Sequence, residues 1–243
     1  MITIEEKKIE GLYLREYSPK TSSISVLFLH GYPGAQKNYD IAEHLALKGY
    51  RVFVMHYRGV WKSEGKYSLL SIYPDVEKIL AYIQGLGFSE ERIALIGTSW
   101  GGFVALEIFA RHPNLYKVIL LSPFTNIDPD EEKLKKGAEF LYSVTKPAIK
   151  NYEKEELLKD LKIVQKEYNP LDHLSKLDGK KVLMIHGIKD QVCPIESTLQ
   201  LKSKFNGLSR LFQLQDQDHF LHTRELLFEY CEVFLNSSLK EKV

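Results

Sequence analysis

The chain has few cysteines and no long apolar run, and each shortage excludes a class of protein. Cys193 and Cys231 are the only cysteines among 243 residues, and no Cys-x-x-Cys pair or paired histidine spacing accompanies them. The sequence therefore indicates neither a disulfide framework nor a zinc site. We expect two reduced thiols, although a single bridge between them stays open. Runs of roughly 18 apolar residues and the apolar core of a signal peptide are also missing, so we expect a cytoplasmic protein without a membrane segment.

An excess of charge of one sign is missing too. Lys and Arg total 33 against 32 Asp and Glu, which leaves no net field to attract nucleic acid or an anionic membrane. The composition, with 44% apolar and 27% charged residues, is that of a globular protein. We expect a single domain over residues 1–243, a small uncharged partner, and no metal or cofactor. Whether the chain forms a homo-oligomer stays open.

Apolar strands and amphipathic helices alternate along most of the chain. Strands are expected as a hairpin of edge strands over 2–17 and then at 24–29, 50–55, 93–96, 117–121, 182–185 and 210–214. Helices are expected at 39–48, 74–86, 101–111, 195–205 and 225–239. In the last helix the residues expected on the buried side are Leu226, Leu227, Tyr230, Val233 and Phe234. This alternation predicts the α/β class, with a mostly parallel sheet of about eight strands and helices on both faces.

Residues 124–170 break the alternation. The segment is rich in charge, and its apolar residues recur at helical spacing: Leu134, Ala138, Leu141, Tyr142, Leu157, Leu158 and Leu161. We expect a helical insertion of two or three short helices. Insertions of this length are commonly lids or packing appendages, while the charge by itself indicates only a solvated helix face.

A Gly-x-Ser-x-Gly motif joins an apolar strand to a helix. The segment Gly97-Thr98-Ser99-Trp100-Gly101 follows the strand at 93–96 and precedes the helix at 101–111. Such a sharp turn holds a serine in strained backbone geometry, and glycines are needed where no side chain fits beside it. The helix N-terminus favours developing negative charge. We therefore predict that Ser99 is a nucleophile.

A serine hydroxyl is a poor nucleophile, so it needs a base, and the base needs a third group to orient it. In a parallel sheet the carboxyl ends of all strands meet at one edge, where ligands bind. Asp190 follows the strand at 182–185, and His219 follows the strand at 210–214. The chain order Ser99, Asp190, His219 is that of a hydrolase triad on an α/β sheet. We predict that Asp190 is the acid and His219 the base.

Other residues compete for these two roles. His222 lies three positions after His219, where we expect the last helix to begin. Asp216 and Asp218 are too close in sequence to His219 to orient it easily, and Asp218 suits a turn. The remaining histidines considered for the base are His30, His56, His112 and His186. A lone histidine is more often structural than catalytic, and we prefer His219.

The segment His30-Gly31-Tyr32-Pro33-Gly34 ends the first central strand. It is either a plain Gly/Pro turn or a loop that directs the Tyr32 N–H to the same point as the Trp100 N–H. In the second interpretation the two N–H groups form an oxyanion hole, and His30 is structural. Tyr32, Trp61 and Trp100, together with the helical insertion, are then expected to wall the substrate pocket.

These motifs, taken together, resemble the α/β-hydrolase superfamily, and within it the small carboxylesterases and the catalytic domain of the prolyl-oligopeptidase group. The matching pieces are His30 to Gly34, Tyr57-Arg58-Gly59 with Ser63-Glu64-Gly65, Gly97 to Gly102, His186 to Asp190 with Pro194, and Asp218-His219. The resemblance implies Ser99 as nucleophile, Asp190 as acid, His219 as base, and Tyr32 and Trp100 as oxyanion donors.

Two departures from the family bear on the substrate. The prolyl-oligopeptidase group carries an N-terminal β-propeller, which this chain lacks the residues to build, and Tyr32 stands where many of these enzymes have glycine. Both favour an esterase over a peptidase. The segment His56 to Trp61 replaces the superfamily's usual Asp-x-Arg-Gly-x-Gly and suggests no catalytic role.

The resemblance implies a serine hydrolase that cleaves carboxylic esters through an acyl-enzyme. A peptidase or a thioesterase with the same triad is the alternative, and a non-catalytic ligand-binding protein is a third possibility, since a fold alone never establishes activity. The expected partner is a small ester or a short peptide-like molecule, without nucleic acid or membrane.

Overall fold

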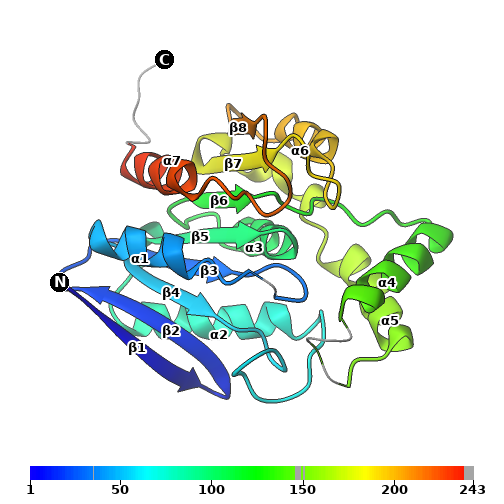
Figure 1. Cartoon of the computed structure of the whole chain (residues 1–243), viewed down its shortest axis with the longest axis horizontal. Coiled ribbons are helices and arrows are strands. Elements are labelled where there is room, and N and C mark those ends of the chain that lie inside the picture. Colours follow the sequence, from blue (N-terminus) through cyan, green and yellow to red (C-terminus); the bar gives the residue numbers. More distant parts are fainter. Residues whose placement is uncertain (35, 146–148, 150, 238–243) are drawn as a thin grey trace.

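The computed structural model describes residues 1–34, 36–145, 149 and 151–237. Within these residues one eight-stranded sheet has the order β1-β2-β4-β3-β5-β6-β7-β8 (Figure 1). The strands are β1 (Ile2–Ile9), β2 (Leu12–Pro19), β3 (Ser25–Leu29), β4 (Arg51–Met55), β5 (Ile93–Thr98), β6 (Val118–Leu121), β7 (Val182–Gly187) and β8 (Arg210–Leu214). The pairs β1–β2 and β2–β4 are antiparallel, and every other pair is parallel. The predicted fold class is confirmed.

Helices cover both faces of this sheet. They are α1 (Tyr39–Leu47), α2 (Ile72–Gly85), α3 (Trp100–Arg111), α4 (Glu131–Thr145), α5 (Lys154–Glu167), α6 (Ile195–Lys202) and α7 (Arg224–Asn236). Alternate residues of each central strand enter opposite core clusters. In β4, for example, Val52 and Val54 pack with α1 and α7, while Phe53 and Met55 pack with the side of α2 and α3. Burial on both faces explains why these strands read as unbroken apolar runs.

Three details of the expected elements are wrong. Only β1 of the N-terminal hairpin is an edge strand, because β2 also pairs with β4. In α7, Val233 is 58% exposed, whereas Leu227, Cys231 and Phe234 are buried. Successive residues of a helix lie about 100° apart, so the neighbour of a buried Phe234 can face solvent. Helix α6 ends three residues before the expected Phe205, and the expected end of α7 at Leu239 lies outside the described residues.

The segment 124–170 contains α4 and α5, which pack together at the edge where the parallel strands end (Figure 1). Buried Asp160 of α5 ties this segment to the loop before α2. Its Oδ2 accepts hydrogen bonds from Ser68 Oγ at 2.6 Å, the Leu69 N–H at 3.0 Å and the Tyr152 hydroxyl at 2.8 Å. The expected helices are present, and residues 146–148 and 150 between them lie outside the described part of the chain.

None of the helices in the described residues is both long enough and apolar enough to cross a membrane.

Candidate active site

Ser99 occupies a strained turn between β5 and α3. Its backbone angles are φ 53° and ψ −121°, a combination that residues with a side chain rarely adopt. The surrounding backbone leaves no room for other side chains. A Cβ atom on Gly97 would lie 2.2 Å from the carbonyl oxygen of Gly101, and one on Gly101 would lie 2.1 Å from that of Leu29. The steric reason expected for these glycines is confirmed.

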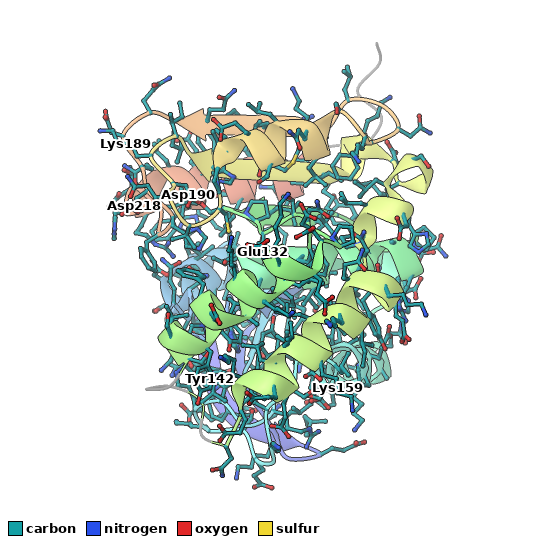
Figure 2. The ribbon with its side chains drawn as sticks, turned by 90° about the vertical axis from the view of Figure 1, so that its right-hand side faces the viewer. Glu132, Tyr142, Lys159, Lys189, Asp190 and Asp218 are labelled. Carbon is teal, nitrogen blue, oxygen red and sulfur yellow. The ribbon has the colours of Figure 1, made fainter. Side chains whose placement is uncertain are left out.

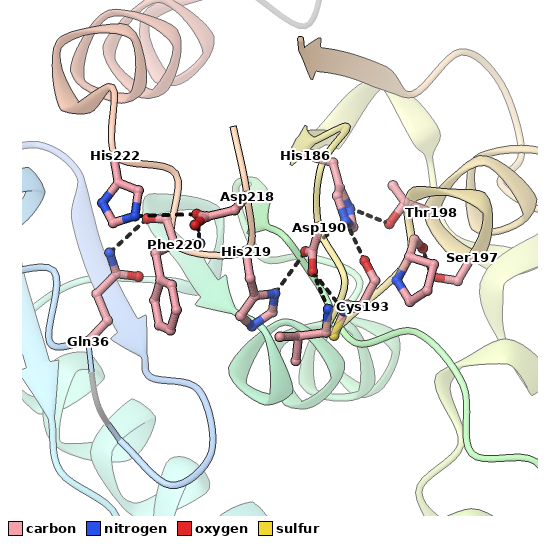
Figure 3. A network of polar contacts seen from close by, with 12 residues as sticks. Gln36, His186, Asp190, Cys193, Ser197, Thr198, Asp218, His219, Phe220 and His222 are labelled. Atoms are coloured by element: carbon pink, nitrogen blue, oxygen red, sulfur yellow. Dashed lines mark hydrogen bonds and ion pairs between the residues drawn. The ribbon is translucent and has the colours of Figure 1, made fainter. Parts of the chain in front are cut away.

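Asp190 and His219 meet at the ends of β7 and β8. His219 Nδ1 lies 2.8 Å from Asp190 Oδ2 (Figure 3), and both residues are buried. Asp190 Oδ1 accepts the N–H groups of Val192 at 2.9 Å and Cys193 at 2.8 Å. Burial alone would raise the pKa of Asp190, but hydrogen bonds from His186, His219 and the Cys193 N–H hold that pKa well below its usual range. Asp190 is therefore an ionised carboxylate that accepts a proton-bearing nitrogen of His219.

A second histidine, which sequence reasoning set aside, also contacts Asp190. His186 Nε2 lies 3.1 Å from Asp190 Oδ2 and 2.7 Å from the Cys193 carbonyl oxygen, and its Nδ1 lies 2.9 Å from Thr198 Oγ1 (Figure 3). Because both neighbours of Nε2 only accept, Nε2 carries the proton and Nδ1 accepts from the Thr198 hydroxyl. His186 lies at the end of β7, four residues before Asp190. This position in the sequence could have indicated the contact.

The competing acids and bases lie away from this pair. The His222 side chain is 73% exposed and lies in the loop before α7 rather than at its start. Asp216 is exposed and pairs at 2.9 Å with Lys189, which lies at the periphery of the molecule (Figure 2). Asp218 accepts the Phe220 N–H at 2.9 Å and shapes the turn, as expected. Of the candidates, only His219 combines a buried carboxylate partner with access to the cavity beside Ser99.

The loop after β3 passes directly beside Ser99. A Cβ atom on Gly31 would lie 3.0 Å from Ser99 Cβ, so glycine permits this approach. The Tyr57 N–H donates to His30 Nε2 at 3.2 Å, which leaves the proton on Nδ1 to donate to the Gly31 carbonyl at 2.8 Å. In a trans peptide the N–H points opposite to the C=O. His30 thereby turns the Tyr32 N–H away from itself, and burial lowers the pKa of His30 to about 4, which keeps it neutral.

Trp100 supplies the other predicted oxyanion donor. It is the first residue of α3, and the first N–H groups of a helix have no partner within that helix.

Tyr32 is fixed at its side chain as well, because its hydroxyl donates to Thr145 at the end of α4, which in turn donates to the Leu141 carbonyl. Burial raises the pKa of Tyr32 to about 12, so this hydroxyl stays neutral.

A cavity of about 620 Å³ joins these groups. Ser99 and His219 both line it, and so do the three aromatic residues expected to do so, Tyr32, Trp61 and Trp100. Helix α4 contributes one face to the cavity: Lys133, Leu134, Gly137, Phe140, Leu141 and Val144. Across the described residues the Ser99 hydroxyl makes no hydrogen bond to His219. Such pairs are often separated until substrate binds.

The cavity also contains a thiol. Both cysteines are free thiols, as expected, and both are buried; Cys193 lies close to Ser99 and Asp190. Burial, followed by the charge of Asp190, raises the pKa of Cys193 to about 12. This thiol is therefore protonated and unreactive near neutral pH. In the described part of the chain, no group of three or more His, Cys, Asp and Glu side chains is arranged to hold a metal ion.

The chain belongs to the α/β hydrolase fold family. Residues 24–158 match the family model described as "alpha/beta hydrolase fold", and the sheet has helices on both faces with a Gly-x-Ser-x-Gly turn at the end of β5. The class of the protein is therefore that of the α/β hydrolase fold.

Individual relatives and solved structures resemble this chain over different lengths. An esterase from Exiguobacterium antarcticum is 25% identical with a TM-score of 0.65, covering 93% of this chain and 96% of its own. A monoacylglycerol lipase from Paleococcus ferrophilus has a TM-score of 0.72 at 18% identity, covering 93% of this chain and 99% of its own. An uncharacterized protein of Rickettsia prowazekii (strain Madrid E) is 29% identical over 126 residues, or 50% of this chain. The chain spans about half the length of this curated relative, 53%.

Proposed function

We propose that the protein is a serine hydrolase that cleaves carboxylic esters through an acyl-enzyme. The observation that carries this proposal is the hydrogen bond from His219 to a buried, ionised Asp190, within the same cavity as the strained Ser99. A hydroxyl, a base and an orienting carboxylate are the three groups that acyl transfer by serine requires. The similarity to an esterase and a lipase supports an ester as the substrate.

In the proposed reaction Ser99 Oγ attacks the ester carbonyl while His219 Nε2 accepts its proton. Asp190 holds the proton of Nδ1, which selects the reactive tautomer and stabilises the imidazolium. The oxyanion accepts hydrogen bonds from the N–H groups of Tyr32 and Trp100. His219 then protonates the leaving alcohol, and a water molecule repeats both steps to release the acid.

The cavity favours a small uncharged substrate over a peptide, a nucleic acid or a membrane surface. Its walls near Ser99 are aromatic, from Tyr32, Trp61 and Trp100. Lys133 and Asp128, which also line the cavity, neutralise each other in an ion pair of 2.7 Å. Helices α4 and α5 act as a lid that closes the apolar side of this cavity.

A thioesterase or peptidase with the same triad is the second candidate, because all three acyl transfers use the same groups. Esterase, thioesterase and peptidase activity differ in the leaving group of the substrate. Among the described residues that line the apolar cavity, no unpaired charged side chain is present to orient a peptide terminus, so we place esters first.

The test combines active-site labelling with turnover. Wild type and Ser99→Ala are incubated with a fluorophosphonate, the adduct is located by mass spectrometry, and hydrolysis of matched p-nitrophenyl esters, thioesters and anilides is measured. We expect the label on Ser99 and a loss of kcat on the order of a million-fold in the variant. Labelling elsewhere, or equal turnover by Ser99→Ala, would refute the proposal, and exclusive anilide cleavage would replace esterase by peptidase.

A further inference from the structure

Gly137 lies in the middle of the face that α4 turns toward the cavity. The neighbours of Gly137 on this face, Leu134, Phe140, Leu141 and Val144, all place side chains at the cavity wall. Their spacing of three and four residues follows the helical repeat, so Gly137 belongs to the same stripe. At this one position the stripe carries no side chain.

The two usual reasons for a glycine do not apply at this position. Gly137 is not among the residues with a positive φ. A Cβ atom built on it would have no heavy atom of the described residues within 4 Å, apart from its chain neighbours and the backbone of its own helical turns. Gly97 and Gly101 differ on this point, since a Cβ atom on either would collide with backbone. A glycine inside a helix also destabilises it relative to alanine. Neither conformation nor packing therefore accounts for Gly137.

We propose that Gly137 keeps open the part of the cavity that receives a long or bulky apolar group of the substrate. This inference rests on the proposed esterase function and deepens it, because it names the substrate class as esters that carry an extended hydrocarbon group. The nearest walls support hydrocarbon. Leu134 and Leu141 flank Gly137 on α4, and Ile127 and Leu161 line the same cavity.

Polar groups at this wall do not compete with a hydrocarbon. Lys133 forms an ion pair with Asp128, and the Lys133 side chain is 66% exposed, so its charge is neutralised and in contact with solvent. Phe140 and Val144 are 54% and 40% exposed while lining the cavity. A hydrocarbon chain that extends past Gly137 would cover these two side chains and remove their apolar surface from water.

The test measures chain-length preference in Gly137→Leu and Gly137→Ala, with Lys136→Leu as the matched control. Lys136 lies on the same helix with a side chain that is 72% exposed, so the control adds the same leucine away from the cavity. Two substrate series are used: p-nitrophenyl esters from acetate to laurate, and acetate esters of alcohols from methanol to dodecanol. The series that responds tells whether the acyl or the alcohol group passes Gly137.

In Gly137→Leu we expect kcat/KM for the longest substrates of one series to fall about tenfold or more, because misplacing one or two methylene groups in an apolar pocket costs about this much. Turnover of the acetate ester should change less than about twofold. Lys136→Leu should keep the wild-type profile, and Gly137→Ala should raise Tm with a smaller change in profile. An unchanged profile in folded, active Gly137→Leu would overturn the inference and leave the esterase proposal intact.

A binding measurement keeps the inference testable without turnover. In the Ser99→Ala background, displacement of cis-parinaric acid by laurate is compared with and without Gly137→Leu. We expect about tenfold weaker binding of both molecules with the added leucine. Dodecanol is tested as a competitor in the same way, because the alcohol group can be the one that passes Gly137. Equal binding of both laurate and dodecanol with and without the added leucine would overturn the inference. Absence of Ser99 labelling and turnover in the wild type would instead refute the esterase proposal.

Discussion

The turn at Ser99 and the helix α4 face each other across one cavity but are built in opposite ways. Around Ser99 the backbone segments touch, and added Cβ atoms on Gly97 and Gly101 would lie 2.2 Å and 2.1 Å from carbonyl oxygens. On α4, Gly137 has open space around it, and apolar Phe140 remains 54% exposed. The difference teaches that the reacting groups are held by backbone packing that admits no substitution, while the opposite wall can change side chains without disturbing them.

After the loss of Ser99 itself, the largest effect is expected at Asp190, which lines up His219 beside the tightly packed turn. Asp190→Asn should lower kcat about ten-thousand-fold, because an amide cannot hold the required tautomer of His219 as a carboxylate does. Asp216→Asn is the control, since the Asp216 side chain is 84% exposed and forms an ion pair with Lys189 instead of orienting His219. Steady-state kinetics on an ester substrate measure both. A similar loss in the two variants would show that the carboxylate next to His219 has no special role.

The two glycines test the comparison directly. Gly101→Ala should destabilise the fold by about 3 kcal/mol or more, because its Cβ would overlap the Leu29 carbonyl oxygen. Gly137→Ala should instead stabilise it by up to about 1 kcal/mol, as helix propensity predicts. Urea unfolding gives both free energies. Equal effects of the two substitutions would remove the distinction between a packed and an open region.

The remaining effect concerns the stability of the fold in acid. Because burial lowers the pKa of His30 to about 4 in the folded protein, below an ordinary value of about 6.5, the unfolded chain binds the proton more readily. His30 therefore contributes stability that is complete above pH about 6.5 and is lost as pH falls toward about 4. We expect the free energy of unfolding to decrease by a few kcal/mol over this interval.

His56, whose pKa burial lowers to about 3, acts in the same direction. Removing one histidine should therefore reduce the acid sensitivity without abolishing it. Urea unfolding of His30→Gln across this pH range measures the change, and a slope equal to that of the wild type would contradict it.

Much of the fold follows from local patterns, and the errors arise where distant segments meet. Apolar runs predicted β3 to β7 because these strands are buried on both faces. The pairing of β2 with β4 was missed because it depends on register between strands far apart in sequence. Val233 was misplaced because helical periodicity alone does not say which of two adjacent apolar residues the sheet will cover.

In the candidate site, too, local patterns could be predicted more readily than contacts between segments. Ser99, Asp190 and His219 could be predicted because each follows a strand whose end lies at one edge of the sheet. For the contact of His186 with Asp190 the sequence offered only the four-residue spacing, because the contact itself depends on how the loop after β7 folds back to place the Cys193 carbonyl. The open space at Gly137 was equally invisible, since a sequence shows a missing side chain but not what surrounds it.

Two nucleophilic atoms of different chemistry, the hydroxyl of Ser99 and the thiol of Cys193, line the same cavity. With its pKa raised to about 12, the thiol is not a competitor for electrophiles near neutral pH. Under the proposed mechanism, fluorophosphonates should phosphonylate the Ser99 hydroxyl and carbamates should carbamoylate it. Alkylating agents that react with thiolates should instead leave Cys193 unmodified, because its thiol is protonated and not because the cavity is too small. Covalent ligands for this protein are therefore best designed to react with a serine hydroxyl, because the neighbouring Cys193 thiol stays unreactive.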